Sequence, residues 1–421
     1  MSVQTILTYT EIDREAWSRL VQTSRTGTWF QTPEAYNFYA SIPDLFRPFA
    51  VAVERVNELT IERTLQGVCV GYVTKERSRL KQFFTGRAII LGGPCLADDA
   101  TVEEVEELMR AVTGYGLRVT GKPIYIETRN FNDYSRWSSA FEAAGFSYQP
   151  HLNFHVDCTD KQKMWERLSD NRKRQVRRGF SNLGFLISRC SNDLLRRMLI
   201  SASLERSAKA VQISNFKFED CYLASLERSA QSRADLGCQI SDFKFLDDIV
   251  TEDDVREWYG ILQELYRTKV KTPLWPVEFF VQAYKQGVGQ FILIRHEGKI
   301  IGGSMVVRKP TPGPSLKGGE MEKAGENGVV YEWYECGMNA EYKEQYPSVM
   351  ATWAGMLYAH EQGCARYDMM GAGVPGVPYG VRDFKAEFGG TMVEHGRWLY
   401  VAKPLLYTIG KAGVRLLKRA H

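Results

Sequence analysis

The residues best suited to chemistry lie in the stretch 367–400, where glycines and prolines surround a compact charged cluster, Arg382-Asp383-Phe384-Lys385. The pattern predicts a strand over 366–370, a turn at Gly371-Ala372-Gly373, a short helix over 380–387 and a final strand over 391–402. Glycine supplies the backbone freedom that such a turn needs. A loop that ends in a lysine on a short helix is a typical location for a functional site.

Further candidates lie on two other elements. A helix expected over 165–180 carries Arg172, Lys173, Arg174, Arg177 and Arg178. Like charges this close on a helix repel one another, so a bound phosphate would relieve a cost. A solvated helix face is the alternative. Arg129 and Asn130 follow a strand at 123–128, and the carboxyl end of a strand is a usual ligand position in α/β sheets.

The elements that position these residues occur twice in the same order: hairpin, strand, helix, strand, short helix, strand. We therefore predict an α/β protein with mixed sheets and two similar domains in tandem, at 1–160 and 246–421. The segment 161–245 between them holds the basic helix and a duplicated insert. In this insert ASLERSA occurs at 202–208 and 224–230, and QISNFKF at 212–218 is repeated as QISDFKF at 239–245.

Composition limits the class of protein. A chain of 421 residues with 44% apolar residues can bury large cores, and a net charge of +4 is too small to indicate nucleic-acid binding by itself. The eight cysteines form no Cys-x-x-Cys pair and the histidines have no metal-ligand spacing, so we expect no metal site. The first residues do not resemble a signal peptide and no apolar run reaches the length of a membrane span, which predicts a cytoplasmic protein.

The tail 404–421 is apolar on one side and basic on the other. It can dock onto the protein itself or lie on an anionic membrane, which would place the chain at the inner face of the membrane.

The junction before the helix at 347–362 is informative because in acyltransferases of the GNAT type its glycine-rich turn binds the coenzyme A diphosphate. Here the junction, 339–347, contains no glycine and two acids, Glu341 and Glu344. A coenzyme A site is therefore poorly supported, and we expect no bound cofactor.

Taken together, these motifs resemble the Fem family of peptidoglycan interpeptide-bridge enzymes, which have tandem GNAT-like domains. The residues that carry the resemblance are the run 29–33 (WFQTP), Gly92-Gly93-Pro94, Tyr125-Ile126-Glu127 with Arg129-Asn130, the basic helix 171–178, and Tyr379 to Gly389. The resemblance implies an acyltransferase that moves an amino acid from an aminoacyl-tRNA to an amino group of a peptidoglycan precursor, either nucleotide- or lipid-linked.

The resemblance also implies roles for individual residues. Lys385 would stabilise the tetrahedral oxyanion of acyl transfer. The motif has no histidine, so a carboxylate, a substrate group or water must accept the proton of the attacking amine, and Asp383 and Asp368 are the candidate carboxylates. The family places an acid after the Gly-Pro strand end, where this chain has Asp98 and Asp99 at an offset spacing. Expected substrate contacts are Phe384, Arg382, Tyr379, Trp29, Gln31, Tyr36, Arg129, Asn130, Arg172, Arg174, Arg177 and Arg178.

Two other functions remain open at this point. One is a GNAT-type N-acyltransferase that uses an acyl thioester on an amino sugar or polysaccharide. The other is a non-enzymatic module that binds RNA or cell-wall precursors.

Overall fold

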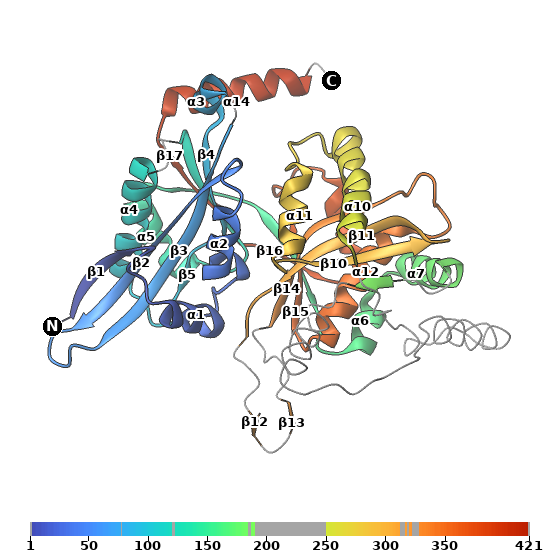
Figure 1. Cartoon of the computed structure of the whole chain (residues 1–421), viewed down its shortest axis with the longest axis horizontal. Helices are drawn as coiled ribbons and strands as arrows, with labels where there is room; N and C mark the ends of the chain where they lie inside the picture. The colour runs from blue at the N-terminus through green and yellow to red at the C-terminus, as the bar shows by residue number, and fades with distance from the viewer. Residues whose placement is uncertain are drawn as a thin grey trace, which may run out of the picture.

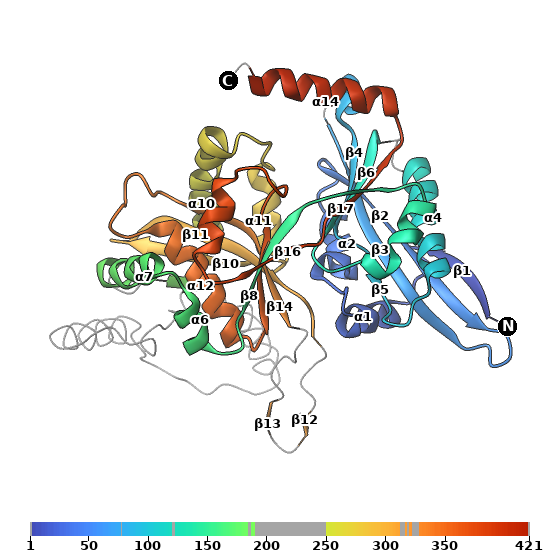
Figure 2. The same ribbon diagram turned by 180° about the vertical axis from the view of Figure 1, so that it is seen from behind.

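We describe a computed structural model of the chain, which defines the backbone of residues 2–76, 78–119, 123–183, 187–189, 250–311, 316–317, 320–321 and 328–419. Figures 1 and 2 show two α/β bodies side by side, each a twisted sheet with helices packed on it. The duplicated insert lies outside the described residues.

The first sheet has the strand order β1-β2-β3-β4-β6-β17-β7, with β5 beside β3. Its strands are β1 (Ser2–Thr8), β2 (Phe46–Asn57), β3 (Arg63–Thr74), β4 (Arg87–Gly92), β5 (Cys95–Leu96), β6 (Tyr125–Asn130), β7 (Ser147–Gln149) and β17 (Arg397–Val401). Its helices are α1 (Arg14–Thr23), α2 (Pro33–Ala40), α3 (Arg79–Thr85), α4 (Val102–Val119) and α5 (Ser138–Ala143), with short 3-10 turns at Trp29–Gln31 and Ser135–Trp137.

The second sheet has the order β16-β8-β15-β14-β11-β10-β9. Its strands are β8 (Leu152–Asp157), β9 (Ile187–Arg189), β10 (Gln290–His296), β11 (Lys299–Arg308), β14 (Val329–Gly337), β15 (Arg366–Gly371) and β16 (Thr391–Glu394). Its helices are α6 (Lys161–Arg167), α7 (Asp170–Leu183), α10 (Glu252–Leu265) with the π-helical turn η4 (Tyr266–Val270), α11 (Val277–Lys285), α12 (Pro347–Glu361) and α13 (Gly380–Ala386). The last helix, α14 (Pro404–Arg419), follows β17 and lies against α3 of the first domain (Figure 1). A small hairpin, β12 (Leu316–Lys317) and β13 (Glu320–Met321), lies between β11 and β14 in the chain.

The two sheets exchange strands, which the sequence did not predict. The alternating stretch 146–157 forms β7 in the first sheet and then β8 in the second, and the single strand expected over 391–402 is β16 in the second sheet followed by β17 in the first. Neither sheet is therefore built from one half of the chain alone.

The two crossings lie next to each other. The N–H of Gly396 donates to the carbonyl of His151 at 3.1 Å. Gly396 has φ +63°, and a Cβ there would lie 2.2 Å from Cε2 of Tyr148. Only glycine lets the chain turn out of one sheet and into the other at this point.

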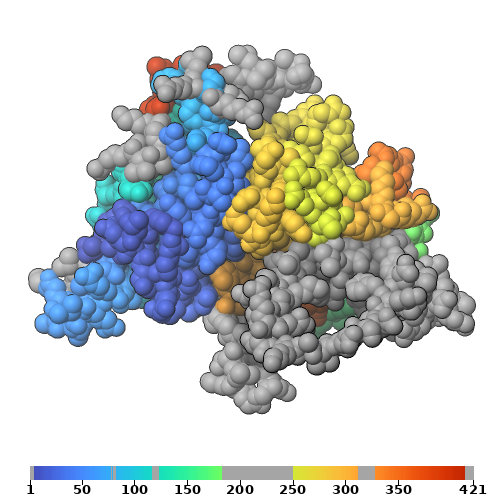
Figure 3. Space-filling model, viewed as in Figure 1, coloured from blue at the N-terminus to red at the C-terminus, as the bar shows by residue number. Residues whose placement is uncertain are grey.

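An aromatic core joins the two bodies. Trp333 of β14 lies 4.9 Å, centroid to centroid, from Phe30 of the first domain, and Phe279 of α11 lies 5.2 Å from Phe38. Trp275, just before α11, lies 4.8 Å from Phe46. In Figure 3 the blue surface of the first domain and the yellow surface of α10 and α11 meet directly. Because this interface is large and apolar, we treat the two domains as one rigid unit.

The strand exchange makes a measurable prediction about Phe141 of α5 and Trp398 of β17, whose rings stack with centroids 4.9 Å apart. Each change to alanine should lower the free energy of unfolding by about 3–5 kcal/mol. In a double-mutant cycle followed by urea unfolding, the pair should couple by about 0.5–1.5 kcal/mol.

The control pair for this cycle is Leu59→Ala with Trp398→Ala. Leu59 is 87% exposed in the β2–β3 turn, and the two changes should add within about 0.5 kcal/mol. A Phe141–Trp398 pair that is as additive as this control would contradict the exchange of β17.

Candidate active site

A cavity of about 420 Å³ lies between the two domains. One side of it is the face of the first sheet that carries Tyr72, Arg87 and Ile89, and the other side comes from η4, the segment before α11, β14 and the end of β15. A concave site at a domain interface, with aromatic walls and a few polar groups, is the usual form of a small-molecule site.

Three arginines line this cavity: Arg87 at the start of β4, Arg129 in β6 and Arg397 in β17. Glu127 binds two of them, since its carboxylate oxygens lie 2.9 Å from Nε of Arg129 and 2.9 Å from Nη1 of Arg397. Burial alone would raise the pKa of Glu127, but the two guanidinium groups outweigh burial and lower the pKa to about 2. Three guanidinium groups outnumber the single carboxylate, so this part of the cavity carries net positive charge and is suited to bind an anion.

His151 adds no positive charge at neutral pH. Burial and the neighbouring Arg397, whose Nη2 lies 2.9 Å from Nε2 of His151, lower the pKa of His151 to about 4. The neutral ring lies at the strand crossing and lines the cavity.

The opposite wall of the cavity is aromatic, with Tyr266, Trp275, Trp333 and Tyr334 among its lining residues. Trp275 is fixed by Phe46 and by Tyr72, whose ring centroid lies 6.4 Å away. Flat rings of this kind suit the faces of a sugar or a base.

Lys385 lies behind the end of β15. Its side chain is 8% exposed, and its Nζ donates to the carbonyl of Met369 and, at 2.8 Å, to that of Gly371. Met370 between them has φ +59°, and the pairing of β15 with β8 shifts register here. Since Met370 and Gly371 line the cavity, the ammonium holds the backbone that forms this wall.

The environment of Lys385 contains opposing charges. Burial lowers the pKa of Lys385, while the carboxyl groups of Glu332, Asp368 and Glu335 act against that shift. Desolvation, with Glu332 nearby, raises the pKa of Glu335 to about 8. Glu332 and Glu335 were not among the site residues predicted from the sequence.

The two proton acceptors suggested by the sequence differ in position. Asp383 is exposed on α13, whereas Lys385, two residues later, is buried, because positions two apart on a helix point away from each other. Asp368 of β15 is fully buried, with its Oδ2 3.1 Å from Nε2 of His155. Burial alone would raise the pKa of Asp368, but His155 and Arg366 hold it below the usual value.

Arg172 of α7 fixes the position of α13. Its guanidinium lies 4.5 Å from the ring centroid of Phe384 and 4.6 Å from that of Phe388. It also donates to the carbonyl of Phe384 at 3.1 Å and pairs with Glu387 at 3.4 Å. Arg172 is only 4% exposed, so its expected contact with substrate is corrected to a contact with the helix that carries Lys385.

Arg382 has a similar structural role in the preceding loop. Its guanidinium donates to the carbonyls of Ala372, Val374 and Val377 at 2.9, 2.6 and 3.1 Å. Tyr379 is 42% exposed beside Gly373 in the same loop. These contacts shape the loop between β15 and α13 and leave the ring of Tyr379 accessible.

The residues predicted near 29–36 do not line the cavity. Gln31 is fully buried, and its side-chain amide bonds the carbonyls of Val70 and Leu91 and the N–H of Val70. Trp29 is buried in the interdomain core, and Tyr36 stacks on Tyr9 with centroids 3.6 Å apart. The expected substrate contacts at Trp29, Gln31 and Tyr36 are therefore corrected to packing contacts.

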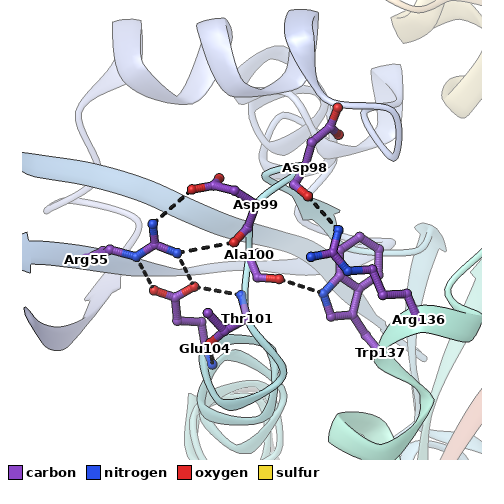
Figure 4. Close-up of polar contacts among 8 residues, drawn as sticks. All are labelled: Arg55, Asp98, Asp99, Ala100, Thr101, Glu104, Arg136 and Trp137. Carbon is purple, nitrogen blue, oxygen red and sulfur yellow. Dashed lines mark hydrogen bonds and ion pairs between the residues drawn. The ribbon is translucent and has the colours of Figure 1, made fainter.

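Asp98 and Asp99 take part in ion pairs on another side of the first domain. Arg55 donates to Asp99 and, through two nitrogens, to Glu104 near the start of α4, while Arg136 donates to the carbonyl of Asp98 (Figure 4). Neither aspartate lines the interdomain cavity. Their geometry supports a structural role at the start of α4.

Arg129 and Asn130 lie at the cavity, as expected for residues at the end of a strand. Asn130 is buried and donates to the carbonyl of His395 at the strand crossing. Arg87 and Arg397 were not predicted from the sequence: Arg87 begins the apolar strand β4, and Arg397 joins the cavity only through the strand exchange.

Helix α7 covers the start of α12. A Cβ on Gly179 would lie 2.7 Å from the carbonyl oxygen of Gln345, and Asn182 donates to the carbonyl of Glu344. Asn339 accepts the N–H of Ser348 in the first turn of α12. The outer face of α7 exposes Arg174, Arg177 and Arg178, of which Arg178 pairs with Glu344. The helix end that binds a coenzyme A diphosphate in GNAT enzymes is thus already packed.

Residues 326–412, which include β14, α12, β15 and α13, match the FemAB family. A search of curated proteins found no match.

Among solved structures, the crystal structure of FemX is similar with a TM-score of 0.50 and 13% identity, covering 96% of this chain and 99% of that one. The C-terminal domain of a putative lysylphosphatidylglycerol synthetase from Agrobacterium fabrum follows, with a TM-score of 0.48, 10% identity and 95% of both chains covered. A tandem GNAT protein from the clavulanic acid pathway has a TM-score of 0.41 and 8% identity, covering 96% of this chain and 99% of that one. The predicted α/β fold with mixed sheets is confirmed, and the likeness to FemX is a likeness of fold.

The contacts of Arg172 generate a stability prediction. Arg172→Lys keeps the charge but loses the planar group that stacks on Phe384 and bonds its carbonyl, so the free energy of unfolding should fall by about 1–3 kcal/mol. The matched control is Arg174→Lys in the same helix, an exposed site where the change should stay within about 0.5 kcal/mol. Equal urea midpoints for the two variants would contradict the role of Arg172 as a support for α13.

Proposed function

We propose that this chain, whose residues 326–412 match the FemAB family, is an acyltransferase that transfers an amino acid from an aminoacyl-tRNA to an amino group of a peptidoglycan precursor. The donor is made in the cytoplasm, so we propose that the chain acts there. The observation that carries the proposal is the buried ammonium of Lys385 directly behind the wall of a cavity lined by three arginines.

The proposed acceptor site is the interdomain cavity. Arg87, Arg129 and Arg397 would bind the diphosphate of the precursor, and the aromatic wall would pack against its sugar. Whether that diphosphate leads to a nucleoside or to a lipid does not change this contact. The exposed Arg174, Arg177 and Arg178 of α7 remain candidates for contact with the tRNA phosphates.

The proposed reaction is acyl transfer from oxygen to nitrogen. The acceptor amine attacks the ester carbonyl of the aminoacyl-tRNA, a C–N bond forms, and the carbonyl oxygen becomes an oxyanion. The C–O bond to the ribose then breaks, and the leaving ribose oxygen takes up the proton that the amine loses, directly or through water. The reaction therefore consumes no net acid or base.

Lys385 would stabilise the oxyanion. An ammonium has three hydrogens, and the carbonyls of Met369 and Gly371 accept two of them. The third can point to the oxyanion, while the two carbonyls fix the nitrogen in place so that little reorganisation is needed during the reaction. Asp368, which stays ionised behind β15, favours the charged form of the lysine.

The alternative acyltransferase, which would use an acyl thioester on an amino sugar, finds less support. The start of α12 is covered by α7 and its first turn is bonded by Asn339, and the junction carries Glu341 and Glu344. Tight coenzyme A binding together with acylation of an amino sugar in the absence of tRNA would favour this alternative. Binding of precursor without turnover, with every charged tRNA, would favour the non-enzymatic module.

The test of the proposal is a transfer assay with purified protein, a mixed pool of aminoacyl-tRNAs and a nucleotide-linked precursor. Lys385→Met should lower kcat by about 10²–10³ and change KM little, because it removes an interaction that is strongest in the transition state. Circular dichroism and urea unfolding must show that the variant is folded. A folded Lys385→Met variant with full kcat would contradict the role of Lys385.

Arg87→Gln is the comparison variant for Lys385→Met. It removes one guanidinium from the cavity and leaves α13 untouched, so KM for the precursor should rise roughly 10–100-fold while kcat changes little. A loss of kcat as large as that of Lys385→Met would mean that the cavity does not act mainly in binding.

A further inference from the structure

Four large apolar side chains are exposed together at one end of the first domain. Phe83 and Phe84 of α3 are 51% and 50% exposed, and Leu405 and Ile409 of α14 are 75% and 55% exposed. We call these four residues the α3–α14 face. Figures 1 and 2 show the two helices lying against each other beyond the ends of β4 and β17.

The two helices are held to each other and to the sheet. The ammonium of Lys403 lies 4.9 Å from the ring centroid of Phe83, and Tyr407 packs on Tyr125 with centroids 5.6 Å apart. The N–H of Ile124 donates to the carbonyl of Gly86 just after α3, and its carbonyl accepts the N–H of Ala402 just before α14. The face is therefore a fixed surface of the folded protein.

The two sides of α14 differ in their exposure to solvent. Leu406 and Tyr407 are partly buried, toward the first sheet, whereas Leu405 and Ile409 are exposed and four positions apart, which places them on one line along the helix. Ala412, three positions after Ile409, is also exposed. Exposed leucine and isoleucine side chains along one side of a helix indicate an interaction surface.

The segments that carry the face are basic in sequence. Residues 403–419 contain five Lys or Arg and no acid, and residues 75–87 contain five Lys or Arg and one acid. At the second-domain rim of the cavity, Lys269, Val270 and Lys271 lie between the cavity residues Tyr266 and Thr272, and Val270 is 41% exposed. Apolar side chains within a basic surround match the interface of an anionic bilayer.

From these observations we infer that the α3–α14 face docks on the surface of an anionic lipid bilayer, with the phenylalanine, leucine and isoleucine side chains entering the headgroup region. A second copy of the chain fits less well, because a symmetric interface would bring two basic surfaces together. A nucleic acid would use the charges but would leave Leu405 and Ile409 in water.

Docking also has a consequence for the acceptor, and this step rests on the proposed function. Arg87 lines the cavity and follows Phe84 by three residues, so the docked face lies next to the arginine end of the cavity. A diphosphate at the bilayer surface could reach the cavity without leaving its lipid. The natural acceptor would then be the lipid-linked form of the precursor.

The experiment is cosedimentation of the full chain with vesicles, without substrate. The vesicles contain phosphatidylcholine alone or phosphatidylcholine mixed with phosphatidylglycerol. The chain should bind the mixed vesicles and bind much more weakly at high salt. Ile409→Glu, which adds a negative charge to the line of α14, should weaken binding to the mixed vesicles by about tenfold or more, and Phe83→Ala with Phe84→Ala should also weaken it.

The matched control is Leu59→Glu, the same charge change at an exposed apolar site in the β2–β3 turn, which should bind like the original chain. Equal binding of Ile409→Glu and Leu59→Glu would overturn the proposal. So would a self-association or an RNA affinity that Ile409→Glu abolishes while vesicle binding stays intact. Transfer to a nucleotide-linked precursor should be unchanged in Ile409→Glu, so a chain that binds vesicles but never transfers an amino acid would refute the proposed function alone.

Discussion

A protonated lysine inside a protein requires fixed acceptors and nearby negative charge, and this requirement organises the second domain. The ammonium of Lys385 finds its acceptors in two carbonyls on either side of Met370, which explains why β15 leaves its regular pairing at that point. Asp368, whose pKa lies below its usual value, supplies opposing charge, and Arg172 holds α13 in place through Phe384 and Phe388. The bend that satisfies the lysine also forms one wall of the cavity.

The strand exchange provides the other half of the site. Because β17 returns to the first sheet, Arg397 lies beside Glu127 and Arg129, and the cavity is closed by residues from both halves of the chain. Two crossings and a shared aromatic core keep the acceptor cavity and the lysine in one rigid body. In the described part of the chain, no helix is long and apolar enough to cross a bilayer.

Local patterns in the sequence indicated much of this arrangement. The tandem order of elements, the short helix with Lys385 and the position of Arg129 at the end of a strand all follow from short-range spacing. The strand exchange could not be predicted, because a run such as 146–157 has the same alternation whether or not it changes sheets at Pro150. The burial of Gln31 and Arg172 could not be predicted either. Both are polar residues, and the groups that they bond lie far away in the sequence, at Leu91 and Phe384. The C-terminal tail and the exposed phenylalanines of α3 lie far apart in the sequence, and only the fold brings them together.

The central claim is that this chain adds an amino acid to a peptidoglycan precursor. The most direct measurement is mass spectrometry of peptidoglycan fragments from cells with and without the protein. The account predicts that fragments from cells containing the protein are heavier by the mass of whole amino-acid residues, joined through an amide to the peptide, and that Lys385→Met removes this increase. Identical fragments from both kinds of cell, with the protein expressed and folded, would contradict it.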